Sequence, residues 1–181
     1  DSRGMGTDGF VIYYHPDDLC RLFTQGRVLV NRCYLHMVLH CLFCHMDTRG
    51  TRKEEDWNLA CDIAVESVID GLYLRCIHRQ MSLYRQDWYG RLKKRLPVLN
   101  AEGVYHILQE MDLPQKQKER LRAEFYADDH GDWNLPSENP KLPMVRQNQW
   151  NKNREQIQTE METMGNQQDE QSKSLLEHIQ V

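Results

Sequence analysis

Two pairs of residues in this sequence have the chemistry and the spacing of a metal site. His36 and His40 lie four residues apart, so on a helix both imidazoles project from one face and can share an ion at zinc–nitrogen bonding distance. Asp62 and Glu66 have the same spacing within an apolar stretch. Because a carboxylate buried without a partner costs several kcal/mol, these acids need a cation, donors or water. The two pairs predict a divalent metal, zinc, held by His36, His40 and Asp62.

Catalytic zinc keeps an open position beside three protein ligands, so we predict a water as the fourth ligand. Glu66 is then expected to serve as general base or to orient a ligand histidine. His130 follows Asp128 and Asp129 in a polar turn and is predicted as an electrophilic helper, unless the aspartates only cap local backbone. The competing interpretation of the carboxylate pair is a helix edge that emerges into solvent, with Asp70 continuing the row.

The segment from Cys41 to His45 matches C-x-x-C-H, the attachment site of c-type haem. Covalent haem needs an exported protein with an open pocket, whereas this motif falls inside an apolar helical stretch. We therefore expect Cys41 and Cys44 to pack in the core. Attachment of haem is a remote alternative. His45 is rotated away from the ligand face of a continuous helix. We predict a capping or hydrogen-bonding role for His45, with ligation only if the helix ends or bends near Cys44.

Two apolar helices must position the candidate ligands. The first is predicted from Arg27 to about Met46 and the second from about Trp57 to Leu74, because apolar residues occur on nearly every face of both. The charged loop between them contains Gly50. Two buried helices joined by a short loop should pack together, which would bring the histidine pair to the carboxylate pair.

The remaining pattern predicts a mainly helical α+β domain over residues 1–135. A short strand is expected over residues 10–14, lining the cleft edge-on, and smaller helices over 16–23, 101–111 and an exposed 116–126. Residues 136–181 are marked by prolines and rich in Gln, Asn and Glu, so we expect a polar linker and helical tail.

Composition excludes some classes of function. The formal net charge of −4 does not favour binding to the phosphates of nucleic acid. No apolar run in the sequence is long enough to span a bilayer. The six cysteines fall mostly in apolar helical stretches, where a free thiol packs as a small hydrophobe. With no signal-peptide pattern, these features predict reduced thiols and a cytoplasmic location.

The order of these motifs resembles the zincin-like metallopeptidase domain found ahead of a von Willebrand factor A-like domain in bacterial proteins. The resemblance covers about residues 6–133 and lies in six short segments: 7–9, 13–16, 36–45, 57–62, 101–105 and 128–130. It implies a peptide or protein substrate, an appended von Willebrand-type domain and partnership with an AAA-type ATPase. The family pattern has a glutamate after the first histidine, within HExxH, where this chain has Met37. Either Glu66 has taken over as base, or the domain is an inactive metal-binding scaffold that recruits partners through its tail.

Overall fold

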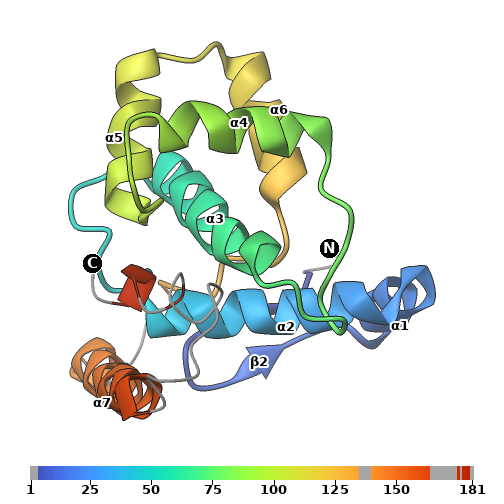
Figure 1. Ribbon diagram of the computed structural model, residues 1–181. Helices are drawn as coiled ribbons and strands as arrows, with labels where there is room; N and C mark the ends of the chain where they lie inside the picture. Colours follow the sequence, from blue (N-terminus) through green and yellow to red (C-terminus); the bar gives the residue numbers. More distant parts are fainter. Residues whose placement is uncertain (1–3, 135–139, 164–174, 176, 180–181) are drawn as a thin grey trace.

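The computed structural model describes residues 4–134, 140–163, 175 and 177–179 and shows a mainly helical fold with one small sheet (Figure 1). This agrees with the predicted class. The sheet pairs β1 (Gly6–Thr7) antiparallel with β2 (Ile12–Tyr13). The helices are α1 (Pro16–Gln25), α2 (Arg27–Leu42), α3 (Glu54–Gly71), α4 (Leu83–Lys93), α5 (Ala101–Met111), α6 (Gln115–Phe125) and α7 (Leu142–Thr163).

Helix α3 is the centre of the fold, with α2 packed on one side and α5 and α6 on the other (Figure 1). One face of α3 carries Leu59 and Ile63 into a cluster with residues of α4, α5 and α6. Another face carries Val68 and Ile69 against Leu39 of α2. Each such side chain contributes about 1.5–3 kcal/mol when fully buried. This two-sided burial explains why α3 has apolar residues all around its axis.

Both central helices differ from the prediction at their ends. Helix α2 ends at Leu42 instead of continuing to Met46, because Cys44 adopts the left-handed conformation with φ of 56° and turns the chain. Helix α3 begins at Glu54 rather than Trp57 and ends at Gly71 rather than Leu74. Its first turn holds three acidic residues, which are favourable beside the positive end of the helix dipole.

The smaller elements also depart from the prediction, and α1 continues to Gln25 instead of ending at residue 23. The strand is shorter than residues 10–14, because Oδ1 of Asp8 accepts the backbone N–H groups of Phe10 and Val11 at 2.8 Å each and commits them to a turn. Helix α5 has the predicted bounds. Helix α6 is not exposed throughout, since Leu121 and Phe125 are fully buried against α4 and α5.

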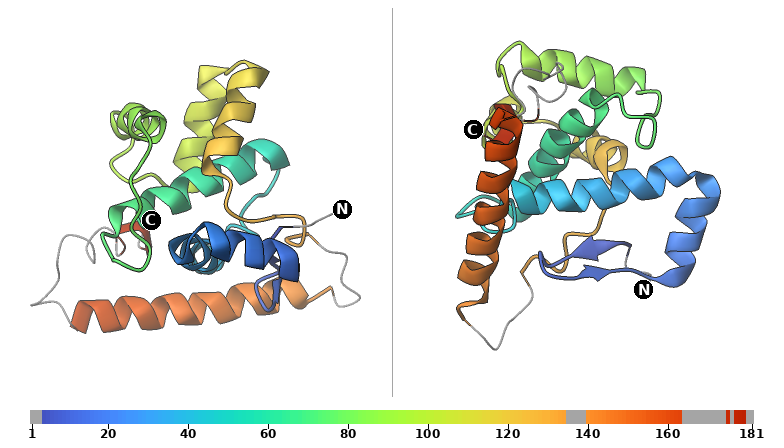
Figure 2. Two further views of the ribbon diagram at one scale, coloured as in Figure 1. Left: turned by 90° about the vertical axis from the view of Figure 1, so that its right-hand side faces the viewer. Right: turned by 60° about the horizontal axis from the view of Figure 1, so that its bottom comes forward.

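Helix α7 lies across α2, as both views of Figure 2 show. Arg146 fixes its first half: the buried guanidinium pairs with Asp47 and donates to the backbone carbonyls of Asp8 and Trp133. Trp150 adds a hydrogen bond from Nε1 to the carbonyl of Gly9 at 2.8 Å. The tail helix is therefore anchored on the domain, while the boundary at residue 135 stays a prediction. Among the described residues, no helix combines the length and apolar character needed to cross a bilayer.

Candidate metal centre

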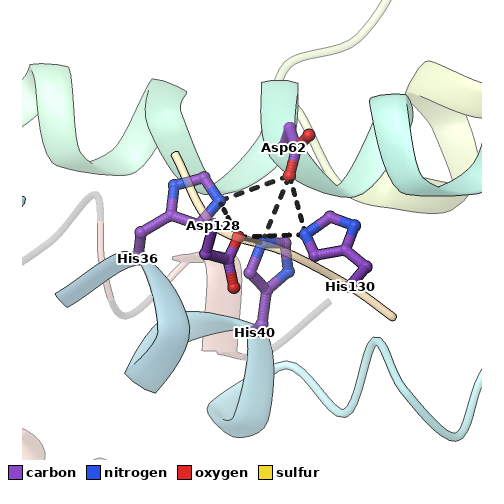
Figure 3. A group of neighbouring side chains, drawn as sticks. All are labelled: His36, His40, Asp62, Asp128 and His130. Atoms are coloured by element: carbon purple, nitrogen blue, oxygen red, sulfur yellow. Dashed lines mark hydrogen bonds and ion pairs between the residues drawn. The ribbon is translucent and has the colours of Figure 1, made fainter. Parts of the chain in front are cut away.

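Three imidazoles and two carboxylates converge at one point between α2, α3 and the segment after α6 (Figure 3). One donor atom from each of the five residues lies within 4.8 Å of all the others. Oδ1 of Asp62 is 3.3, 3.4 and 3.1 Å from Nε2 of His36, His40 and His130, respectively. Oδ1 of Asp128 is 3.3, 3.8 and 3.0 Å from the same three nitrogens.

The donor set fits a metal ion. Ligands about 2.0–2.2 Å from a shared zinc ion stand about 3–3.6 Å from one another, which is close to the spacing of these nitrogens and oxygens. Nε2 of His40 and Oδ2 of Asp128 are buried and form no hydrogen bond with any residue that the structure describes. Unsatisfied buried polar atoms in a native fold call for a missing partner, and a cation bound between these groups would supply one.

Each element presents its donors for a local reason. His36 and His40 are one helical turn apart on α2, so their rings lie side by side with centroids 4.5 Å apart. Asp128 and His130 are two residues apart in a non-helical segment, where alternate side chains share a face.

The small sheet holds the segment that carries Asp128 and His130. Gly6 of β1 forms a parallel bridge with Asp129, and the N–H of Asp129 donates to the carbonyl of Met5 at 2.7 Å. A Cβ atom on Gly6 would lie 2.5 Å from the carbonyl oxygen of Asp129. Glycine at this position therefore allows the close approach that brings the last two donors to the cluster.

The charges of the metal-free cluster also suit a divalent ion. Burial lowers the pKa of His36 and of His130, but the neighbouring carboxylates outweigh it, so both pKa values are raised above the ordinary value for histidine. Burial opposes ionisation of Asp62, yet His130 holds its pKa well below the usual range. Burial also lowers the pKa of His40, which is neutral. Two carboxylates thus face two protonated imidazoles, and a divalent cation can replace those two protons without changing the net charge.

Behind the cluster, Glu66 orients His36. Nδ1 of His36 lies 2.9 Å from Oε1 of Glu66, while its Nε2 points at the cluster. Oε2 of Glu66 accepts from Arg32 at 2.7 Å and from Arg85. With both oxygens committed on this side, the arrangement fits the orienting role predicted as the alternative for Glu66, in which a carboxylate fixes the tautomer of a ligand histidine.

The acidic row on α3 does not emerge into solvent. Asp70 pairs with Arg32 at 2.6 Å and Arg85 at 2.9 Å and accepts the hydroxyl of Tyr89 at 2.9 Å. The side chains of Arg32, Glu66, Asp70 and Arg85 are each 5% exposed or less. Two cations balance two anions in this buried network, so the competing interpretation of a solvated helix edge is wrong.

His45 stands behind His40 in the same way. Because α2 ends at Leu42, the chain turns and the ring of His45 lies next to that of His40. The two Nδ1 atoms are 2.9 Å apart. The backbone carbonyl of His45 accepts Nε1–H of Trp57 at 3.0 Å. His45 thus has a hydrogen-bonding role, as predicted, and the structure identifies His40 as its partner. Cys41 and Cys44 are buried. This burial argues against attachment of haem to their sulfur atoms.

A cleft of about 270 Å³ reaches the cluster between α3, α6 and the segment after α6. Asp62, Asp128 and His130 line its floor, and the walls include Asn58, Arg122 and Tyr126.

The expected strand at residues 10–14 does not line this cleft. It borders a separate cavity of about 150 Å³, which also contains Met37, so the position of the usual HExxH glutamate faces the hairpin instead of the cleft.

The structure brings together four residues singled out from sequence, His36, His40, Asp62 and His130. Glu66 lies one step behind them. Sequence reasoning missed Asp128 as a donor and assigned it only a backbone-capping alternative. The sequence feature that could have identified Asp128 is its position two residues before His130. That spacing puts both side chains on one face of an extended segment.

No curated protein and no solved structure in the comparisons matches this chain significantly. A family model does match, over residues 1–179, and its description is a putative metallopeptidase domain. The match includes both apolar helices, every donor of the cluster and the helix α7. The chain therefore belongs to this family of putative metallopeptidase domains.

Proposed function

We propose that this domain holds one zinc ion and hydrolyses peptide bonds in the cleft beside it. The observation that carries the proposal is the convergence of three imidazole nitrogens and two carboxylate oxygens on a point whose open side is the floor of a cleft. Imidazole and carboxylate donors in this number suit zinc. When bound, zinc supplies a polarised water and a Lewis acid toward a carbonyl oxygen.

Three imidazoles and Asp128 are the proposed ligands, and a water from the cleft would be a fifth, a coordination number that catalytic zinc can reach. Asp128 has a fully buried side chain, whereas the side chain of Asp62 is 9% exposed and lines the cleft. With His130 completing the histidine set, Asp62 need not serve as the third ligand. We assign the role of proton acceptor to Oδ1 of Asp62. Met37 and Glu66 are not assigned this role, because neither residue lines the cleft.

The test is zinc content and peptidase activity of Asp62→Asn compared with the unmodified protein. The proposal expects zinc at near-unit occupancy in both proteins and a rate of peptide hydrolysis at least about 100-fold lower in the variant. Asn58→Ala, one turn away on the same helix and in the same cleft, serves as the matched control and should keep most of the activity. Full activity in Asp62→Asn rules out the assigned role.

A second candidate function is a metal-stabilised scaffold without catalysis. It is favoured by the replacement of the usual glutamate by Met37 and by a donor set large enough to fill the coordination of zinc without water. In this alternative the protein binds zinc but cleaves no peptide in a diverse library. Residues 136–181 are then the proposed site of partner recruitment, and the family resemblance supports a von Willebrand-type domain and an AAA-type ATPase as proposed partners.

A further inference from the structure

Another cavity is lined by His45, the residue that contacts His40 of the metal cluster. It measures about 230 Å³ and is bordered by the turn after α2, the start of α5, the middle of α7 and His178, whose ring stacks on Phe43. That volume is far above the roughly 10–15 Å³ needed by a single water, so the cavity has room for a ligand of several heavy atoms. Its polar lining includes His45, Asn100, Glu102 and Arg154, and its apolar lining includes Phe43 and Leu99.

His45 offers this cavity a hydrogen-bond donor. If Nε2 of His40 binds a metal, its Nδ1 carries the proton and donates to Nδ1 of His45, 2.9 Å away. Nδ1 of His45 is then an acceptor, so the proton of that ring is on Nε2. His45 is only 4% exposed, and no residue that the structure describes bonds its Nε2. A ring nitrogen of His45 that bonds no described residue therefore borders the cavity.

Two opposite charges border the same cavity without pairing. Arg154 of α7 donates to Oδ1 of Asn151 at 3.0 Å, and no carboxylate of the described residues pairs with it. Glu102 of α5 forms no hydrogen bond or ion pair within the described part of the chain. Both residues are partly buried, where a charge gains from a partner. A molecule with one negative and one positive group can serve both.

We propose that this cavity binds a small zwitterion of the α-amino acid class. Its carboxylate accepts from Arg154 and from Nε2–H of His45, and its ammonium group donates to Glu102. The apolar wall by Phe43 and Leu99 suits a short aliphatic side chain. A carboxylate on His45 extends the hydrogen-bonded chain through His40 and strengthens His40 as a metal ligand, so the two sites are coupled.

L-alanine is the probe, followed by isothermal titration calorimetry on the full chain. Propionate lacks the ammonium group and ethylamine lacks the carboxylate, so the proposal expects each to bind at least about 10-fold more weakly than L-alanine. Arg154→Gln and Glu102→Gln should each weaken L-alanine at least about 10-fold, whereas Lys152→Gln, an exposed residue of the same helix, should change nothing. Absence of saturable L-alanine binding, or equal binding of propionate, overturns the proposal.

Coupling is measured as the zinc dissociation constant with and without saturating L-alanine. The expected change is a tightening of about 5-fold or more, and zinc must tighten L-alanine by the same factor. His45→Phe, which fills a similar volume without ring nitrogens, should remove the coupling. An unchanged zinc affinity overturns the relay. Binding of L-alanine to the metal-free protein is a separate readout, so failure of the proposed hydrolase leaves this site testable.

Discussion

Nδ1 of His36 lies 2.9 Å from Oε1 of Glu66, on the opposite side of the ring from the nitrogen that faces the metal cluster. A carboxylate accepts, so Nδ1 carries a proton, and a metal that displaces the second proton would find the lone pair of Nε2 directed at the cluster. The two arginines on Oε2 of Glu66 then hold that carboxylate in place. A buried ion-pair network thus fixes the tautomer and the direction of one proposed ligand.

Replacing Glu66 with Gln tests this orienting role. The amide oxygen can still accept from His36, but the charge that supports the imidazole is lost, so zinc affinity should fall about 10- to 100-fold. The affinity is measured by competition with a chelator of known strength. Glu110→Gln, at an exposed position on α5, is the control and should have no effect. Unchanged zinc affinity together with lost hydrolysis would instead make Glu66 the base.

Replacing Arg85 with Met should destabilise the fold. Glu66 and Asp70 each lose a cation in a site where their side chains are 3% exposed or less, and breaking a buried pair costs about 3–5 kcal/mol. The free energy of unfolding is measured by urea titration. Arg91→Met removes an exposed pair with Asp87 on the same helix and should cost about 1 kcal/mol or less. Equal effects of the two changes contradict a structural role for the network.

Replacing Met37 with Glu should not raise the rate of peptide hydrolysis. Met37 is 1% exposed and borders the cavity under the hairpin, so a carboxylate there is buried away from the cleft. The variant is expected to lose several kcal/mol of stability in thermal unfolding, whereas Met37→Leu should cost less than about 1.5 kcal/mol. A gain of peptidase activity in Met37→Glu contradicts the placement of this residue.

Removing the metal should lower the stability of the unmodified protein. It should not lower the stability of a variant that has lost a metal-binding side chain. A ligand bound only to the folded state adds about 2.7 kcal/mol when its concentration is 100 times the dissociation constant. Calorimetric scans with zinc and with EDTA should therefore differ in Tm for the unmodified protein and for His106→Ala, an exposed histidine of α5. His40→Ala should show no such difference. If it responds to EDTA as the unmodified protein does, His40 is not a ligand.

The sequence was sufficient for features that depend on local periodicity. The apolar residues around α2 and α3 predicted two buried helices, and the spacing of four predicted that His36 and His40 share a face. The end of α2 was not predictable, because left-handed backbone at Cys44 has no glycine to signal it. That turn decides where His45 points.

The rest of the site depends on contacts between distant parts of the chain. Asp128 reaches the cluster because Asp129 bridges to Gly6 at the other end of the sequence. The cations that balance Glu66 and Asp70 come from α2 and α4, and nothing in the spacing of Arg32 and Arg85 identifies them as partners. Non-local pairing of this kind follows from the three-dimensional packing and leaves no periodic pattern in the sequence.

The central claim is that His36, His40 and His130 bind one metal ion together. Zinc X-ray absorption on the purified protein, combined with elemental analysis, tests it most directly. The account predicts near-unit zinc with three imidazole nitrogens and at least one oxygen at about 2.0–2.2 Å. Absence of a transition metal after zinc loading, or a first shell that contains sulfur or fewer than three imidazoles, would contradict it.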